Sequence, residues 1–128
     1  MTSREPAYLI DHVSVPVGDL ATAKAFYIAA LEPLGFGIIM EFPGAVAFGP
    51  AGKPQLWLHQ GMPSASIHIA LHAENESVVQ AFHAAGLAGG GADNGQPGLR
   101  PHYHPGYYAA YVHDPDGNNV EAVFHGQP

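Results

Sequence analysis

The stretch Ile10–Leu20, with the sequence IDHVSVPVGDL, decides the fold of this chain, and it is typical of a β-strand that runs into a turn. We expect a strand over Tyr8–Val17. Successive side chains of a strand point to opposite faces, so the valines at 13, 15 and 17 form one aliphatic face. His12 and Ser14 lie on the other face. The stretch therefore predicts a strand that packs on one side and offers polar groups on the other.

A helix is predicted directly after this strand. Asp19 is a favourable N-cap residue, because its side chain accepts a hydrogen bond from the first helical turn. Apolar residues then recur at helical spacing: Leu20, Ala23, Phe26, Ala30, Leu31 and Leu34. Pro33 and Gly35 mark the end of the helix.

The rest of the chain predicts further strands and a second helix. The expected strands are 36–41, 45–48, 55–59, 66–72, 107–113 and 119–124, and the expected helix is 75–85. The sequence DPDG at Asp114–Gly117 predicts a tight turn between the last two strands. We expect Gly86–Gly98 to be a glycine-rich loop, with residues 89–91 as a flexible connector. We also expect His83, on the second helix, to lie at the surface.

The second half of the sequence echoes the first at an offset of 56 residues. His12 corresponds to His68, Phe26 to Phe82, and Gly35 to Gly91. Each copy reads as a strand, a helix and three strands. Two copies fill the chain as a single domain, with module one over about residues 7–61 and module two over about 65–125. The two histidines thus hold equivalent places, and both enter one cleft if the two sheets curl toward each other.

The composition excludes several classes of function. The chain has 128 residues, a net charge of −7 and only 4 basic residues, which are scattered along it. Binding to nucleic acid or to an anionic membrane needs a concentrated positive patch. The absence of cysteine removes disulfides, thiolate ligands and cysteine nucleophiles. Residues 1–6 contain no apolar signal core, and the apolar runs are too short to span a bilayer, so we expect a cytoplasmic protein that acts on a small molecule.

Two segments resemble the vicinal-oxygen-chelate superfamily. They are the opening stretch 10–20 with Ala25-Phe26-Tyr27, and the sequence DPDGNNVE at Asp114–Glu121. The superfamily includes glyoxalase I, extradiol ring-cleaving dioxygenases, fosfomycin-resistance thiol transferases and bleomycin-binding proteins. The resemblance covers nearly the whole chain. It implies an α+β fold in which two tandem βαβββ modules form a cupped mixed β-sheet with a metal-containing cleft, often within a dimer. We expect a homodimer, also because the chain has few charges and much apolar content.

The resemblance also implies a metal site. Members of the superfamily take ligands from the first and last strands of their modules, and the matching positions here hold His12, His68 and Glu121. A fourth matching position holds Trp57, where glyoxalase I has a glutamate, and this departure argues against glyoxalase I activity. A set of two histidines and one glutamate is similar to that of the dioxygenases and the fosfomycin-resistance enzymes. His59 shares the face of Trp57 and takes its place if the register differs by two residues.

Two imidazoles and one carboxylate on one side of a metal ion leave its other side open. Such a site suits one Fe, Mn, Ni, Co or Zn ion. The open positions accept two neighbouring oxygens of a substrate, and the metal acts as a Lewis acid. The candidate catalytic residues are Glu121, His104 and Tyr107, the last two as proton or hydrogen-bond donors unless they belong to a packed aromatic loop. The candidate substrate-binding residues are Trp57, His59, Arg100 and Ser14.

Two classes of function remain open at this point. The first is a divalent-metal-dependent enzyme of the lyase or isomerase, ring-cleaving dioxygenase, or thiol-transferase type. A phosphonate-binding transferase is the weakest of these, because only Arg100 is expected near the cleft. The second is a metal-free protein that sequesters a drug or metabolite, as bleomycin-binding proteins do. The joint presence of His12, His68 and Glu121 favours the enzyme, since a sequestering pocket does not need them.

Overall fold

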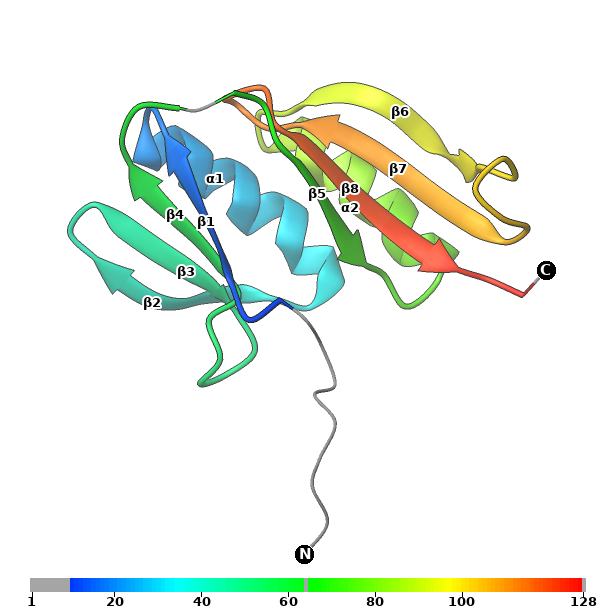
Figure 1. The fold of residues 1–128 in the computed structure, drawn as a ribbon, viewed down its shortest axis with the longest axis horizontal. Coiled ribbons are helices and arrows are strands. Elements are labelled where there is room, and N and C mark those ends of the chain that lie inside the picture. Colours follow the sequence, from blue (N-terminus) through cyan, green and yellow to red (C-terminus); the bar gives the residue numbers. More distant parts are fainter. Residues whose placement is uncertain (1–9, 64, 128) are drawn as a thin grey trace, which may run out of the picture.

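The computed structural model describes residues 10–63 and 65–127, and within them the chain repeats one βαβββ unit (Figure 1). The elements of the first copy are β1 (Val13–Val17), α1 (Leu20–Leu31), the 3-10 turn η1 (Glu32–Leu34), β2 (Gly37–Phe42), β3 (Ala45–Gly49) and β4 (Leu56–Gln60). The elements of the second copy are β5 (His68–His72), α2 (Glu76–Ala88), β6 (Ala92–Leu99), β7 (Tyr107–His113) and β8 (Asn119–His125).

Each copy forms its own four-stranded mixed sheet. The strand orders are β1-β4-β3-β2 and β5-β8-β7-β6. The pairs β1–β4 and β5–β8 are parallel, and the other pairs are antiparallel. Figure 1 shows both sheets in front of the two helices, so the open faces of the sheets lie on the same side of the molecule. The predicted α+β fold of two tandem modules is confirmed.

The duplication extends to the helix caps and to the strand register. The Asp19 side chain accepts from the backbone N–H of Thr22 at 3.2 Å, and Asn75 caps the second helix in the same way. In the first sheet Ser14 pairs with Trp57, and in the second Ala70 pairs with Glu121. Since positions 14 and 70 are 56 residues apart, Trp57 is the structural counterpart of Glu121. His59 lies two residues further along, opposite Pro16.

The expected loop at 86–98 is wrong. Helix α2 continues to Ala88, and β6 follows at Ala92–Leu99. β6 is an edge strand whose register shifts on both sides of Gly95. An edge strand has one side without a sheet neighbour and therefore tolerates glycine, proline and bulges that a central strand rejects. The glycines and Pro97 that made the segment resemble a loop are compatible with this position.

The expected flexible connector at 89–91 is also wrong, because these glycines are packed. The backbone N–H of Gly89 caps helix α2 by donating to the carbonyl of Ala85. A Cβ atom at Gly91 would lie 2.5 Å from ring and methyl carbons of Phe26 and Val112. The segment allows α2 to end close against α1 and β7.

We therefore expect Gly91→Ala to destabilise the protein by about 2 kcal/mol, because the added methyl has no room in the core. Chemical denaturation followed by circular dichroism measures this change. Gly37→Ala is the matched control, since a Cβ atom at Gly37 meets nothing within 4 Å, and its effect should stay within about 0.5 kcal/mol. Equal effects of the two substitutions would contradict the close packing at Gly91.

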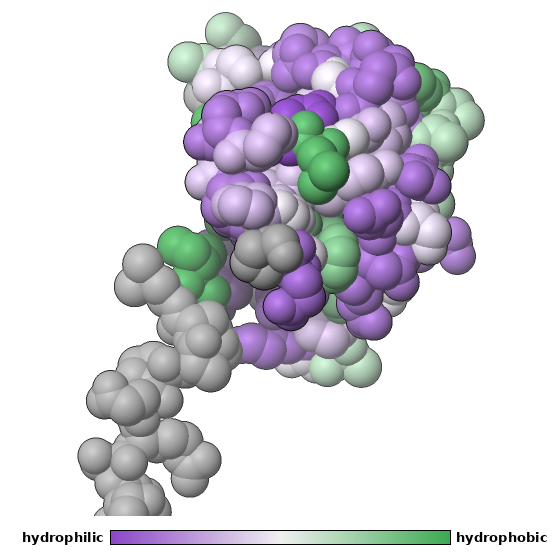
Figure 2. Space-filling view, turned by 90° about the vertical axis from the view of Figure 1, so that its right-hand side faces the viewer, coloured by the Kyte–Doolittle hydropathy of each residue, from purple (hydrophilic) through white to green (hydrophobic). Residues whose placement is uncertain are grey.

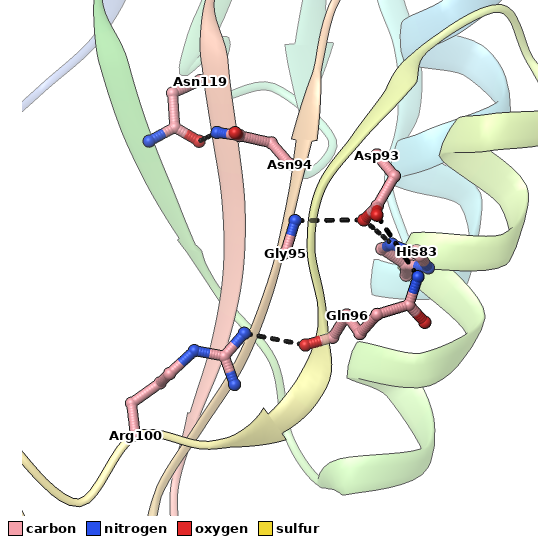
Figure 3. A network of polar contacts seen from close by, with 7 residues as sticks. All are labelled: His83, Asp93, Asn94, Gly95, Gln96, Arg100 and Asn119. Carbon is pink, nitrogen blue, oxygen red and sulfur yellow. Dashed lines mark hydrogen bonds and ion pairs between the residues drawn. The ribbon is translucent and has the colours of Figure 1, made fainter.

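His83 is buried, against the expectation from sequence. Its side chain is only 6% exposed, and its Nε2 lies 2.8 Å from Asp93 Oδ1 at the start of β6 (Figure 3). The backbone N–H of Gly95 donates to the same carboxylate. The hydrogen bond from His83 is the main cause that lowers the pKa of Asp93. This error follows from the first one, because the strand that was taken for a loop covers this face of α2.

The hydrophobic core lies between the helices and the aliphatic faces of both sheets. Its largest members include Phe26, Phe48, Leu58, Val79, Phe82, Val112 and Val120. Tyr27 of α1 is fully buried and donates its hydroxyl to Asp114 Oδ2 at 2.6 Å, which connects module one to the turn between β7 and β8. Within the described residues, neither helix is long and apolar enough to cross a membrane.

Candidate functional site

The second sheet places Glu121 and His68 together on its open face. Their strands, β8 and β5, are parallel neighbours, and His68 Nε2 lies 2.7 Å from Glu121 Oε1. Glu121 is 1% exposed, whereas the side chain of His68 is 53% exposed. A buried carboxylate loses its hydration, so it needs partners for both oxygens. The pair thus presents one buried oxygen ligand and one accessible nitrogen ligand to the same point.

Tyr107 supplies the second partner of Glu121. It comes from the neighbouring strand β7, and its hydroxyl donates to Glu121 Oε2. Burial, followed by the hydrogen bond to Glu121, raises the pKa of Tyr107. The phenol therefore stays protonated and acts as a hydrogen-bond donor that fixes the orientation of the carboxylate. This placement agrees with the predicted role of Tyr107 as a donor at the site.

Tyr111 is a further residue of this site that the sequence did not single out. It lies directly opposite Glu121 in the register of β7 and β8, and its ring centre is 6.3 Å from that of His68. Burial, with the charge of Glu121 second, raises the pKa of Tyr111 to about 12. Its alternation with Tyr107 and Ala109 along β7 is the signal that could have placed it on the same face.

This raised pKa predicts a loss of stability at high pH. Tyr111 loses its proton near pH 10 in the unfolded chain but only near pH 12 in the folded protein. Its contribution to the free energy of unfolding is therefore complete below about pH 10 and is lost as the pH rises through about 12. Denaturant unfolding at a series of alkaline pH values measures the decline, and Tyr111→Phe should make it shallower. An unchanged decline in that variant would show that Tyr111 is not responsible.

Arg100 lies beside Tyr111 on the second sheet. The guanidinium carbon is 5.4 Å from the centre of the Tyr111 ring, which is a cation–π distance. Its Nη2 donates to the backbone carbonyl of Gln96 at 2.7 Å (Figure 3). Arg100 is thus held in place near the aromatic wall of the site, where the sequence placed a residue that binds a substrate anion.

His104 is not brought into contact with Glu121. Its Nε2 lies 2.9 Å from His125 Nδ1, and its own Nδ1 is 2.7 Å from the carbonyl oxygen of Pro105. Both imidazoles pack edge-on against the ring of Tyr107. His104 therefore supports Tyr107 from the side that faces away from the carboxylate.

His12 lies in a separate cavity on the first sheet. This cavity has a volume of about 500 Å³ and is lined by Asp11, His12, Ser14, Gly52, Lys53, Pro54 and Trp57. His12 Nδ1 is 2.8 Å from Asp11 Oδ1, and Lys53 Nζ is 3.5 Å from the other oxygen of Asp11. The hydrogen bond from His12, followed by the charge of Lys53, lowers the pKa of Asp11. Two of the predicted substrate-binding residues, Ser14 and Trp57, thus share a cavity with the predicted ligand His12.

The first and second sheets keep their candidate ligands apart within one chain. Figure 1 shows β1 starting at the lower edge of the molecule and β5 starting at its upper edge, so His12 and His68 lie toward opposite ends. Among the residues that the structure describes, no three His, Cys, Asp or Glu side chains are grouped so that they can hold a metal ion. One chain therefore offers two half-sites, one around His12 and one around the His68–Glu121 pair.

Comparison with known proteins supports the architecture. A family model described as the Glyoxalase/Bleomycin resistance protein/Dioxygenase superfamily matches residues 9–122. A search of curated proteins finds no match. Among solved structures, a glyoxalase/bleomycin resistance protein from Albidiferax ferrireducens is 32% identical, with a TM-score of 0.78 over 93% of this chain and 98% of that chain.

Two more distant structures share the fold. A glyoxalase/bleomycin resistance protein/dioxygenase family enzyme from Burkholderia phytofirmans is 17% identical, with a TM-score of 0.69 over 90% of this chain and 97% of that chain. Lactoylglutathione lyase from Agrobacterium tumefaciens is 21% identical, with a TM-score of 0.66 over 94% of this chain and 95% of that chain. With the family model spanning both modules and a 32% identical relative of nearly equal extent, this chain belongs to the glyoxalase/bleomycin resistance protein/dioxygenase superfamily.

Proposed function

We propose that the protein is a divalent-metal-dependent enzyme that activates a small substrate through two neighbouring oxygen atoms. The observation that carries this proposal is the His68–Glu121 pair, in which a carboxylate with only 1% exposure lies 2.7 Å from an accessible imidazole nitrogen. Burying a carboxylate is costly. A pocket that only sequesters an apolar drug gains nothing from this arrangement, whereas a metal centre needs it.

The donor atoms fit a divalent transition metal. An imidazole nitrogen and a carboxylate oxygen are suitable ligands for Fe, Mn, Ni, Co or Zn. His68 and Glu121 would hold the ion, and His12 would be the third ligand. A bound ion would supply a Lewis acid for charge that develops on two substrate oxygens. Tyr107 holds the carboxylate of Glu121 in place, and Tyr111 and Arg100 form the wall beside it.

We propose that two copies of the chain complete the site. Since His12 lies at the opposite end of the chain from His68, the half-site of one copy meets the complementary half-site of a second copy. The open face of the first sheet also carries Met40 and Phe42, which are 38% and 56% exposed, and Phe42 stacks on Trp57. A second copy would cover this apolar face. By contrast, the side of the molecule in Figure 2 is mostly hydrophilic, with hydrophobic residues in isolated positions.

The first test is metal content by elemental analysis of tag-free protein, followed by thermal unfolding with each of the five ions. We expect about one ion per chain and stabilisation by the preferred ion. The reaction type follows from the metal and from oxygen consumption, because a ring-cleaving dioxygenase consumes O₂ and a lyase or isomerase does not. Failure of every ion to bind would leave a metal-free small-molecule binding protein as the better account, with the cavity beside Trp57 as its pocket.

A second test asks whether the ligands come from two chains. His12→Ala and Glu121→Ala are each expected to lose the bound metal. When the two variants are unfolded together and refolded, half of the dimers pair unlike chains, and each of these dimers has one intact site. The mixture should therefore recover about a quarter of the metal content of the natural protein. No recovery in a sample that refolds into dimers would show that the ligands come from a single chain.

A further inference from the structure

We propose that the cavity beside His12 binds a small planar carboxylate, with Lys53 holding the carboxylate group and Trp57 holding the planar body. This inference names a substrate class for the proposed function, and it rests on that function only in placing the cavity next to the ligand His12. The binding itself needs no metal and is tested without one.

The cavity has the size and the lining of a small-molecule site. Its volume of about 500 Å³ lies within the range of roughly 300–1,000 Å³ that ligand pockets occupy. The indole of Trp57 forms an aromatic wall and is itself backed by the ring of Phe42, with a centroid distance of 6.2 Å and an angle of 19°. Polar groups come from the hydroxyl of Ser14, the imidazole of His12 and the ammonium of Lys53. Such a mixture orients a flat ligand that has one polar end.

The fold explains why Lys53 is at this place. Because β1 and β4 are parallel neighbours, the residues that precede β4 lie beside the residues that precede β1. The backbone N–H of Lys53 donates to the carbonyl of Pro50 at 2.9 Å, and the N–H of Gln55 donates to the carbonyl of Phe48 at 3.0 Å. These bonds fix the loop between β3 and β4. The ammonium is therefore attached to an ordered backbone at the mouth of the cavity.

The charges around the cavity favour an anionic ligand group at Lys53. The chain has a net charge of −7 and 4 basic residues, so a cation in a cavity is rare in this molecule. Asp11 accepts from His12 at 2.8 Å, whereas Lys53 Nζ is 3.5 Å away from the same carboxylate, longer than a direct charge-assisted hydrogen bond of about 2.7–2.9 Å. An ammonium has three donors, so a ligand carboxylate can bind Lys53 while Asp11 stays beside it. Asp11 then weakens anion binding, and its removal should strengthen it.

Trp57 is the single tryptophan of the chain and reports on the cavity directly. We would titrate the full-length protein, after removal of metal by a chelator, with benzoate and with its neutral analogue benzamide, and follow tryptophan fluorescence. We expect benzoate to bind saturably and at least about fivefold more tightly than benzamide. Lys53→Gln should weaken benzoate at least about fivefold and leave benzamide unchanged, while Lys53→Arg keeps most of the affinity for benzoate.

Two further variants separate charge from packing. Asp11→Asn should tighten benzoate binding, which is the opposite sign to Lys53→Gln. Lys24→Gln is the matched control, because Lys24 is paired with Glu41 on the helix side of the first sheet, and it should have no effect. Equal affinities for benzoate and benzamide, or no change in Lys53→Gln, would overturn the inference.

The outcomes also separate this inference from the proposed function. Benzoate binding that persists in Glu121→Gln, together with absence of metal in the natural protein, would support the carboxylate site and reject the metalloenzyme. Metal binding in the natural protein without any response of Trp57 to benzoate would reject the carboxylate site and leave the metalloenzyme standing.

Discussion

Glu121→Gln is expected to lower the affinity for a divalent metal on the order of 100-fold or more, while the protein stays folded. The substitution keeps the volume of the buried side chain, and the amide oxygen can still accept from the hydroxyl of Tyr107. It removes the anionic charge of the ligand set, which an amide cannot replace. Loss of a mere supporting hydrogen bond to a metal ligand typically costs about 10–100-fold in affinity, so loss of the ligand charge itself should cost at least as much.

The measurement is a competition titration against a chelator of known affinity, with circular dichroism to verify the fold. Glu32→Gln is the matched control, because Glu32 is an exposed glutamate of η1 and should leave the metal affinity unchanged. If Glu121→Gln is folded and still binds metal as tightly as the natural protein, Glu121 is not a ligand and the proposed metalloenzyme has to be abandoned.

The repeat in the sequence predicted more of this molecule than local propensity did. The offset of 56 residues, taken from two histidines, also relates the two helix N-caps and the pairs Ser14–Trp57 and Ala70–Glu121. A duplicated unit must repeat its strand register, because a shift of one residue would turn every side chain to the other face of the sheet. The counterpart of Glu121 could therefore be located at Trp57 without a structure.

Local composition failed where an element lies at an edge. The segment 92–99 contains two glycines and a proline, and these residues indicate a loop when they are considered alone. The repeat required a third strand at this point, and the structure has it as β6. Here tertiary context outweighed propensity, because the edge of a sheet accepts an irregular strand. The burial of His83 beneath that strand could not be predicted once the strand was missed.

The relation between the two modules was beyond the sequence for a different reason. Alternation in a strand assigns His12 and His68 to open faces, and this assignment agrees with the structure. Whether two open faces meet in one chain depends on how α1 and α2 pack, and that packing rests on contacts such as the close approach of Gly89 to Ala29. No motif marks such contacts. Lys53 was missed for a similar reason, since it enters the site from a loop next to a parallel strand pair.

The contact that holds the modules in this relation predicts the largest loss of stability, in Asp114→Ala. Asp114 is 4% exposed and lies in the turn between β7 and β8. Its carboxylate accepts from Tyr27 of module one at 2.6 Å, from the side chain of Asn118 at 2.9 Å and from the backbone N–H groups of Asn118 and Asp116. Removing it leaves a buried hydroxyl and a buried amide without their partner, and each such orphan costs about 1–3 kcal/mol.

We therefore expect Asp114→Ala to lower the free energy of unfolding by about 3 kcal/mol or more, as measured by chemical denaturation. Asp116→Ala, in the same turn, is the control and should cost less than about 1 kcal/mol, because Asp116 is less buried and accepts a single backbone bond from Gly18 at 3.2 Å. Tyr27→Phe should cost about 1–2 kcal/mol in the natural protein and much less in the Asp114→Ala background. Additive costs in the double variant would mean that the two side chains are not coupled, and the link between the modules would then have to lie in the apolar packing of the helices alone.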